Sequence, residues 1–293
     1  MSQSTTDDDL IQYPSGFGLS DIVAWGTTGL VVLDTSSKTV IKTPLDPDDE
    51  ECVGRISRER QVYERFAKCG GHKGILSYHG TYESGIRLEL ASNFNLRSYN
   101  KKHDVGFLQR LRWAIQIAEA ISFIHRACVI HGDLTSANIF LDENLNAKLA
   151  DFAGSSLDNS PLLVIVTESH EFPGPLLSVR ADLFAFGSVL YEIFTKHAPY
   201  EGLDETEIRT RYVKGKFPET GLLQEIGAII NKCWEGHYWS SETIVDDLRA
   251  QESKALISPY PYGVIAKTST LVTIVIVAAT FLLFSRKVSA QIR

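Results

Sequence analysis

The spacing of apolar and polar residues changes character part-way along the chain. The first third carries short runs rich in β-branched and aromatic residues, separated by Gly, Ser, Asp and Asn, which is typical of strands joined by turns. The runs that we expect to form strands are residues 21–25, 30–34, 39–42, 75–82 and 86–90. A glycine-containing turn separates the first two, and Ser84 and Gly85 separate the last two, so each pair predicts a hairpin.

Apolar residues at three- and four-residue steps dominate the rest of the chain and predict amphipathic helices. The segments that we expect to form helices are residues 56–68, 107–126, 181–195, 205–212 and 222–234. Between them, residues 129–152 are a dense run of short strands and loops. A strand-rich front of about 80 residues followed by a helical remainder predicts an α+β protein of two lobes with a cleft between them.

Composition narrows the class of protein. The chain has 293 residues, 44% of them hydrophobic, which is enough for a substantial core and too apolar for a disordered chain. Asp and Glu outnumber Lys and Arg by 36 to 29, and no basic run interrupts this, so we expect no nucleic-acid partner. Four cysteines lie far apart without a C-x-x-C pair, so neither a disulfide framework nor a zinc site is expected. We expect Trp113, Trp234 and Trp239 to pack in the core or between the lobes and not to bind a ligand.

The C-terminal region differs in composition from the rest of the chain. Residues 268–285 contain no charge and are closed by Arg286 and Lys287. A helix of this length is about 27 Å long, close to the thickness of a thin bilayer core. We expect a transmembrane helix that contacts a lipid bilayer as a tail anchor, with the globular part in the cytosol. A buried terminal helix or strand is the alternative.

The expected boundaries follow from these changes in composition. They are a disordered leader over residues 1–18, a first lobe over 19–91, a second lobe over 92–252, a linker over 253–267, the transmembrane helix over 268–285 and a basic tail over 286–293.

The chemistry concentrates in residues 129–151. Asp133 stands five residues before Asn138, ahead of an apolar strand, and Asp151 follows a second short strand. Three oxygen-bearing side chains are therefore expected around one hairpin. Hard oxygen ligands suit Mg²⁺ with a polyphosphate, and a carboxylate that is free of the metal can receive a hydroxyl proton.

Short motifs along residues 20–250 resemble, in order, those of the eukaryotic protein-kinase family. The motifs are a Gly-rich loop at residues 24–31, a third-strand lysine in Val40-Ile41-Lys42, a helix glutamate at Glu59, a hinge at residues 88–91, a catalytic loop in His131-Gly132-Asp133 with Asn138, and a D-F-G equivalent in Asp151-Phe152-Ala153. Each motif alone is weak evidence for the family, but six motifs in the family's order are strong evidence. The resemblance implies a two-lobe kinase fold, with a small β-rich N-lobe and a larger helical C-lobe, that uses ATP and Mg²⁺ on a protein substrate.

The resemblance also implies the role of each residue. Asp133 would orient and deprotonate the acceptor hydroxyl, Lys42 would hold the α- and β-phosphates, and Glu59 would hold Lys42. Asn138 and Asp151 would ligate Mg²⁺. The residues to which it assigns nucleotide contacts are Val23, Gly26, Gly29, Val31, Val40, Lys42, Glu89, Ala91 and Phe140.

Ordinary structural roles are the alternative for these residues taken one at a time. Lys42 alone could be a solvated strand residue, Gly26 and Gly29 a hairpin turn, Asp133 a loop cap, and Asp182 the cap of the helix that it begins. We also expect His131 and Phe152 to be packing residues that align the site rather than reactive groups.

The chain departs from the family pattern at four positions. Ala24 replaces the first glycine of the loop, and Ala153 replaces the glycine of D-F-G. Gly132 replaces the arginine of H-R-D, so we expect no switching by a phosphorylated activation loop through that contact. Thr135 stands where serine/threonine kinases usually carry a lysine. The A-P-E motif is also missing, and Phe172-Pro173-Gly174-Pro175 occupies its region.

Three functions fit these observations. An active protein kinase, for Ser or Thr, is favoured by the joint presence of Lys42, Glu59, Asp133, Asn138 and Asp151. A pseudokinase that binds nucleotide or serves as a scaffold is favoured by Ala24, Thr135, Ala153 and the missing A-P-E motif. A small-molecule phosphotransferase is the third possibility, because its family's loop also lacks the lysine at the Thr135 position.

Overall fold

The computed structural model describes residues 12–26 and 29–257. It divides into two compact units, Met1–Arg249 and Ala250–Arg293. Of the second unit, only the end of one helix lies among the described residues. The transmembrane helix expected at residues 268–285, and the basic tail after it, lie outside them. No helix within the described part of the chain is long and apolar enough to cross a membrane.

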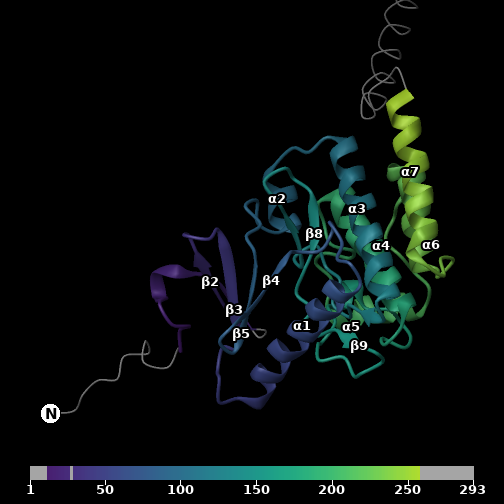
Figure 1. The fold of residues 1–293 in the computed structure, drawn as a ribbon. Coiled ribbons are helices and arrows are strands. Elements are labelled where there is room, and N and C mark those ends of the chain that lie inside the picture. The colour runs from purple at the N-terminus through teal and green to yellow at the C-terminus, as the bar shows by residue number, and fades with distance from the viewer. Residues whose placement is uncertain (1–11, 27–28, 258–293) are drawn as a thin grey trace, which may run out of the picture. The chain divides into compact units, whose positions relative to one another are not determined.

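The strands gather at one end of the first unit, where Figure 1 shows β2, β3, β5 and β4 side by side. They form a five-stranded antiparallel sheet in the order β1-β2-β3-β5-β4. Its strands are β1 Ile22–Gly26, β2 Gly29–Asp34, β3 Thr39–Thr43, β4 Tyr78–Tyr82 and β5 Gly85–Glu89. The expected hairpins are confirmed: β1 pairs with β2, and β4 pairs with β5.

Helix α1, Glu50–Lys68, crosses between β3 and β4 in the chain and packs against β5. The Asp49 carboxylate caps its first turn by accepting from the Glu51 N–H. One face of α1 is buried and carries Ile56, Glu59, Val62, Tyr63 and Phe66. A carboxylate in the middle of this apolar face needs a partner, and the site described below supplies it.

Helices make up most of the remaining part of the first unit, with four short strands among them. The helices are α2 Leu96–Lys102, α3 Phe107–Arg126, α4 Val179–Thr195, α5 Glu205–Val213, α6 Glu225–Trp234 and α7 Ser241–Ile257. The strands are β6 Val129–Ile130, β7 Ile139–Leu141, β8 Ala147–Leu149 and β9 Ser156–Leu157. Short 3-10 turns occupy Leu19–Asp21, Glu168–His170 and Gly221–Leu223. The α+β fold with a β-rich N-lobe and a helical C-lobe is therefore confirmed.

One hydrophobic core runs through both lobes. It joins Phe66 of α1 and Ile86 of β5 to Ile121 of α3 and Phe184 of α4. A smaller cluster of Leu30, Val32 and Ile41 packs the other face of the sheet. The continuous core fixes β3 and α1 relative to the short strands β7 and β8, and these are the elements that carry the expected site residues.

The observed elements differ from the expected ones mainly at polar ends. Helix α1 begins six residues before the expected start because its first turn is polar and is set by the Asp49 cap. Helices α2 and α7 were not expected. The first has seven residues, and its start depends on the Asn95 side chain, which accepts from the Ser98 N–H. Strand β4 begins at Tyr78 rather than residue 75, because Ile75 instead forms an isolated bridge with Leu149.

Two aromatic residues of the expected disordered leader belong to the folded unit. Tyr13 and Phe17 pack against the small cluster of the sheet. The Phe17 ring meets Tyr82 edge-on, with 6.1 Å between their centroids. The leader therefore does not extend to residue 18 as expected, because its last residues bury apolar surface on the sheet.

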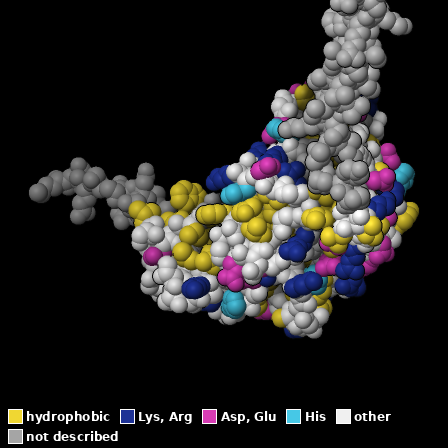
Figure 2. All heavy atoms as spheres, turned by 90° about the horizontal axis from the view of Figure 1, so that it is seen from above, with side chains coloured by type: hydrophobic (Ala, Val, Ile, Leu, Met, Phe, Trp, Pro, Cys, Tyr) yellow, Lys and Arg dark blue, Asp and Glu magenta, His cyan; other side chains and the backbone are white. Residues whose placement is uncertain are grey.

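Charge is mixed on the face that Figure 2 presents. Lys and Arg side chains lie among Asp and Glu side chains there, with apolar side chains between them. Charges of one sign do not gather into a single broad field on this face.

Trp239, expected in the core or between the lobes, is 78% exposed, whereas Trp113 and Trp234 are buried. That expectation is wrong for Trp239, whose ring instead faces the Arg180 guanidinium at 5.6 Å.

Candidate active site

Lys42 is the centre of the site. Its Nζ lies 2.7 Å from Oε2 of Glu59 and 2.7 Å from Oδ1 of Asp151. The three residues come from β3, from α1 and from the segment after β8, so the buried carboxylate of α1 has its partner. The Lys42 side chain is 8% exposed and that of Glu59 is 1% exposed. The structure thus joins three residues that lie far apart in sequence into one buried ionic cluster.

Burial and charge act in opposite directions on this cluster. Burial alone would lower the Lys42 pKa, but the negative charges of Asp151 and Glu59 outweigh it and raise that pKa above its ordinary value. Burial would raise the Asp151 pKa, but Lys42 holds it below its ordinary value. Burial raises the Glu59 pKa, and Lys42 opposes that rise. Lys42 is therefore a fixed cation, and the Asp151 carboxylate beside it is ionised.

Glu59 also contacts the segment that follows Asp151. Its Oε1 accepts from the Phe152 backbone N–H at 3.2 Å. Asp151 has a left-handed backbone, with φ +61°, which turns the chain sharply between β8 and Phe152. Glu59 consequently positions both Lys42 and the turn that carries Asp151.

Asp133 and Asn138 form the second group. The Asn138 amide Nδ2–H₂ donates to Asp133 Oδ2 at 2.9 Å and to the Asp133 carbonyl at 2.8 Å. The other carboxylate oxygen, Oδ1, is buried and has no hydrogen-bond partner within the described residues. Burial raises the Asp133 pKa above its ordinary value, which makes this carboxylate a better proton acceptor than an exposed one. Oδ1 is therefore the carboxylate oxygen that keeps an unused acceptor position.

Asp182, for which a helix cap was the structural alternative, instead holds the loop that contains Asp133. The cap of α4 is Ser178, whose side chain accepts from the Ala181 N–H. Asp182 is buried and accepts from the backbone N–H of His131 at 2.8 Å and of Gly132 at 3.0 Å. It also lies 2.8 Å from His125 Nε2. Three donors thus converge on one carboxylate and fix the loop.

His131 and Phe152 are packing residues, as expected. His131 is 1% exposed and its Nε2 lies 3.1 Å from the Ala150 carbonyl oxygen. The Phe152 ring, fully buried, meets Tyr63, Phe66 and His131 with centroid separations of 5.4, 5.0 and 5.1 Å. This aromatic cluster ties α1 to the loop of Asp133 and to the turn of Asp151.

Gly29 ends the turn between β1 and β2 and has to be glycine. Its φ is +143°, and a Cβ there would come within 2.3 Å of the Thr43 carbonyl oxygen. Gly29 pairs with Gly26, and Val31 pairs with Lys42 across β2 and β3. Residues 27 and 28 at the tip lie outside the described residues. The close approach brings the turn onto the strand that carries Lys42.

The residues expected to contact adenine come from the sheet, the segment after it and β7. Val31, Val40, Ala91 and Phe140 are partly exposed and Val23 is 51% exposed, so apolar surface remains accessible there. No described contact joins these residues into one binding surface, and their roles stay predictions.

The Glu89 side chain is engaged elsewhere. Its carboxylate accepts from Ser77 and lies 3.2 Å from Lys148 Nζ. The Ala91 carbonyl accepts from the Phe94 N–H at 3.4 Å. The Glu89 side chain is therefore occupied by protein partners, and the nucleotide contacts of Glu89 and Ala91 stay predictions.

Two departures from the family pattern have local explanations. Gly132 has φ +79°, and a Cβ there would lie 2.5 Å from Leu162 Cδ2, so the space beside it is filled by Leu162. Thr135 is 4% exposed, and its carbonyl accepts from the Asn138 N–H. Thr135 therefore supports the loop and offers no cation to a phosphate.

The segment that lacks A-P-E is held by other contacts. Glu171 pairs with Arg209 of α5, with 2.7 Å between Oε2 and Nη2. The Arg180 guanidinium faces the rings of Phe172 and Trp239 at 5.5 and 5.6 Å. An exposed ion pair and a cation between two rings thus fix the end of this segment.

Asn138 and Asp151 fit the hard oxygen ligands that Mg²⁺ prefers. The Asn138 amide nitrogen donates to Asp133, so its Oδ1 is the atom of that side chain that can act as a ligand, while the Asp151 carboxylate already binds Lys42 and accepts from the Ala153 backbone N–H. Among the described residues, no three His, Cys, Asp or Glu side chains form a metal cage. A metal held here would therefore complete its coordination with substrate phosphates and water, which is common for Mg²⁺.

Comparison with known protein families decides the class. A family model described as protein tyrosine and serine/threonine kinase matches residues 25–242. The chain belongs to this family. The matched range includes Lys42, Glu59, Asp133, Asn138 and Asp151, so the site lies inside a protein kinase domain.

Curated relatives of this kinase domain include kinases of both acceptor types. It is 29% identical over 157 residues to the RGS domain-containing serine/threonine-protein kinase A of Dictyostelium discoideum. The matched stretch covers 50% of this chain and 14% of the relative. The chain is 29% identical over 173 residues to the megakaryocyte-associated tyrosine-protein kinase of Mus musculus, covering 55% and 34%. Against a probable LIM domain-containing serine/threonine-protein kinase of Dictyostelium discoideum it is 25% identical over 230 residues, covering 73% and 35%. The chain thus matches about a third or less of the length of these relatives.

Proposed function

We propose that the protein is an active kinase that transfers the γ-phosphoryl group of ATP to a serine or threonine hydroxyl of a protein. The observation that carries the proposal is the buried cluster in which Lys42 meets both Glu59 and Asp151 at 2.7 Å. A buried cation flanked by an ionised carboxylate on one side and a positioning carboxylate on the other is what phosphoryl transfer requires.

The proposed reaction needs a fixed positive charge at the triphosphate. Lys42 is charged throughout the physiological pH range, because its carboxylate partners raise its pKa. Glu59 holds the ammonium group in place, so the charge does not have to be ordered when the nucleotide arrives. Lys42 would bind the α- and β-phosphate oxygens.

Asp133 would receive the proton of the acceptor hydroxyl. Its unpartnered Oδ1 would be the acceptor for that hydroxyl, and the Asn138 amide keeps the carboxylate oriented through Oδ2. Asn138 and Asp151 would hold Mg²⁺, which neutralises charge on the phosphates when it is bound.

A pseudokinase is the second candidate, and the buried Thr135 favours it. No side chain at this position can supply the positive charge that serine/threonine kinases usually place beside the γ-phosphate. In that case the site would bind ATP and Mg²⁺ without transferring the phosphoryl group.

We also propose that residues 268–285 anchor the protein in a membrane, with the kinase domain in the cytosol. The uncharged stretch of 18 residues supports this. Extraction of the full-length protein by carbonate without detergent would contradict it, whereas extraction only with detergent would support it.

The proposed activity is tested with the full-length protein, γ-labelled ATP, Mg²⁺ and a mixed protein substrate. The test compares the wild type with Asp133→Asn and Asp151→Asn, and Asp246→Asn serves as an exposed control of the same chemistry. Label transfer by the wild type and the control, but not by the two site variants, would support the kinase. Thermal stabilisation by ATP and Mg²⁺ without transfer would support the pseudokinase. Phosphoamino-acid analysis of the product decides between Ser/Thr and Tyr.

A further inference from the structure

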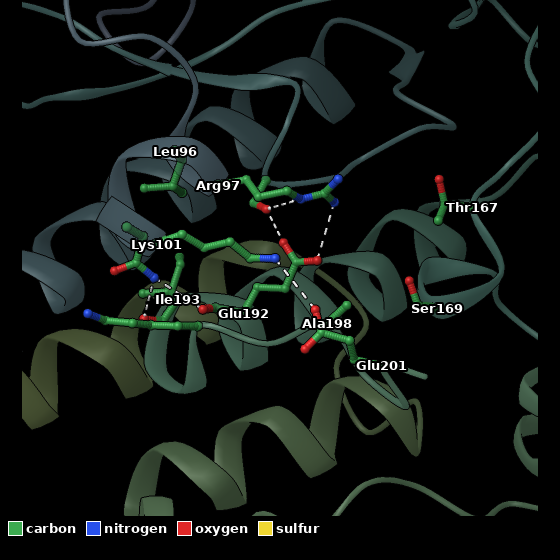
Figure 3. Close-up of a pocket in the computed structure, with 12 residues that line it drawn as sticks. Leu96, Arg97, Lys101, Thr167, Ser169, Glu192, Ile193, Ala198 and Glu201 are labelled. Atoms are coloured by element: carbon green, nitrogen blue, oxygen red, sulfur yellow. Dashed lines mark hydrogen bonds and ion pairs between the residues drawn. The ribbon is translucent and has the colours of Figure 1, made fainter. Parts of the chain in front are cut away.

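A pocket outside the cluster of Lys42 lies beside the loop that carries Asp133. Its volume is about 190 Å³, and its walls come from α2, α4, the loop residue Ser136 and the segment around Thr167. Figure 3 shows Arg97 and Glu192 on one side of the pocket and Thr167 and Ser169 on the opposite side. Ser136 is three residues from Asp133, so a polypeptide that presents a hydroxyl to Asp133 has this pocket close to it.

The negative charge at the base of the pocket is already compensated. Glu192 is 5% exposed, and its carboxylate accepts from Arg97 Nη2 at 3.3 Å and from the Ser136 hydroxyl. His170 Nε2 lies 3.8 Å away. A second cation brought to Glu192 would have to compete with Arg97, so this carboxylate is a poor attractor for a basic side chain.

The positive charges of the pocket are less completely compensated. Arg97, Lys101 and Lys196 line it, against the two carboxylates of Glu192 and Glu201. Arg97 remains 38% exposed after its contact with Glu192, and Lys101 is 53% exposed at 3.5 Å from Glu201. Lys196 donates to a neutral acceptor, the His103 carbonyl, at 2.9 Å. The lining therefore carries one more positive than negative charge, in a protein whose net charge is −7.

The charge of Arg97 also acts on the loop itself. Burial raises the Asp133 pKa, and Arg97 is among the groups that oppose the rise. The opposite wall is rigid and polar, because the Ser169 carbonyl accepts from the hydroxyls of Ser188 and Tyr212. Thr167 is an exposed residue on this side. An anionic side chain that enters would meet cations on one wall and a hydroxyl donor on the other.

We propose that this pocket selects protein substrates with an Asp or Glu side chain near the phosphorylated residue, and that Arg97, Lys101 and Lys196 bind its carboxylate. The inference rests on the proposed kinase function, since it names the substrate class of that same site. The contact is partly exposed, so it is worth a modest factor and weakens with salt.

The test uses the full-length protein and synthetic peptides with a central serine, in which each flanking position is occupied in turn by Asp, Ala or Lys. We expect at least one position at which Asp raises kcat/KM about fivefold over Lys, and a smaller ratio at high salt. Binding of the same peptides, labelled with fluorescein, is measured in parallel by anisotropy in the presence of a non-hydrolysable ATP analogue. If the pocket does not bind the peptide, no position will show a preference for Asp.

Substitutions in the pocket test whether its cations cause the preference for Asp. Lys101→Glu should abolish the preference for Asp, whereas Lys102→Glu, an exposed neighbour that does not line the pocket, should leave it intact. Arg97→Ala frees Glu192 and should shift the preference toward Lys. Since Arg97→Ala also leaves a buried carboxylate unpaired, its folding is checked by thermal melting, and Lys101→Glu provides the test if it unfolds.

The outcomes separate this inference from the proposed function. Phosphotransfer that is indifferent to Asp, or that favours Lys at every position, would overturn the inference and leave the kinase function standing. Absence of phosphotransfer to every peptide, with tighter binding of the Asp peptides, would count against the kinase function and support the pocket. Binding without a preference for Asp would overturn the pocket in either case.

Discussion

Leu162 occupies the space that a side chain on Gly132 would need: a Cβ at Gly132 would lie 2.5 Å from Leu162 Cδ2. The glycine also has φ +79°, which L side chains adopt at a cost of about 1–2 kcal/mol. The position where the family usually carries an arginine is therefore packed in a different way, and not merely shortened.

Gly132→Arg should consequently damage the protein and not restore a family feature. We expect the free energy of unfolding to fall by roughly 2–4 kcal/mol, the sum of backbone strain and collision, in urea denaturation. Gly71→Arg is the matched control, because Gly71 has φ +69° but nothing within 4 Å of its Cβ position. An equal loss in the two variants would show that Leu162 makes no contribution.

Lys42→Met should remove the charge that holds two carboxylates together. We expect a loss of about 3 kcal/mol in unfolding free energy and no thermal stabilisation by ATP and Mg²⁺. Without Lys42, burial leaves the pKa values of Glu59 and Asp151 raised in the folded state. The stability of the variant relative to wild type should therefore decrease further as pH rises from 5 to 8.

Two further variants separate these effects. Lys68→Met, on the exposed end of α1, should change neither property. Lys42→Met combined with Glu59→Gln should recover part of the stability but none of the nucleotide effect. A Lys42→Met protein that is still stabilised by ATP would contradict the proposed role of this residue.

Asp182→Asn should loosen the loop of Asp133 without touching the Lys42 cluster. An amide has one acceptor oxygen, so at least one of the donors His131 N–H, Gly132 N–H and His125 loses its partner. We expect unfolding free energy to fall by about 2 kcal/mol and phosphotransfer to fall by about tenfold or more, with nucleotide affinity kept. Asp246→Asn is again the control, and a change in nucleotide affinity alone would refute this role.

His170 should make stability depend on pH. Burial lowers its pKa from 6.5 to about 4, although Glu192 opposes the shift. Between these two values the unfolded chain binds more protons than the folded one. Stability should be fully present above pH 6.5 and decline as pH falls toward 4, by roughly 3 kcal/mol from this residue. The difference in slope between wild type and His170→Gln, from denaturation at several pH values, measures the contribution; parallel curves would contradict it.

The two-lobe architecture could be predicted from the sequence. The motifs also singled out the five residues Lys42, Glu59, Asp133, Asn138 and Asp151. Strand and helix periods predicted the two lobes, because α3 and the sheet have long, regular apolar patterns. The motif order predicted that Lys42, Glu59 and Asp151 would meet, although Lys42 and Asp151 are separated by 109 residues.

The remaining features depend on tertiary contacts that no local pattern carries. Arg97 and Glu192 are 95 residues apart, and neither belongs to a recognised motif, so the pocket that they form had no signal in the sequence. The short α2 has too few residues for a period to emerge. Trp239 was misjudged because hydrophobicity does not distinguish a core position from a ring that shields a surface arginine.

The aromatic cluster around Phe152 has a consequence for how the site tolerates substitution. Tyr63 and Phe66 lie on α1, and His131 lies in the loop of Asp133, so one buried ring supports both groups of the site. We expect a smaller side chain at residue 152 to loosen Glu59 and the Asp133 loop together, so that the two groups lose their order as one unit.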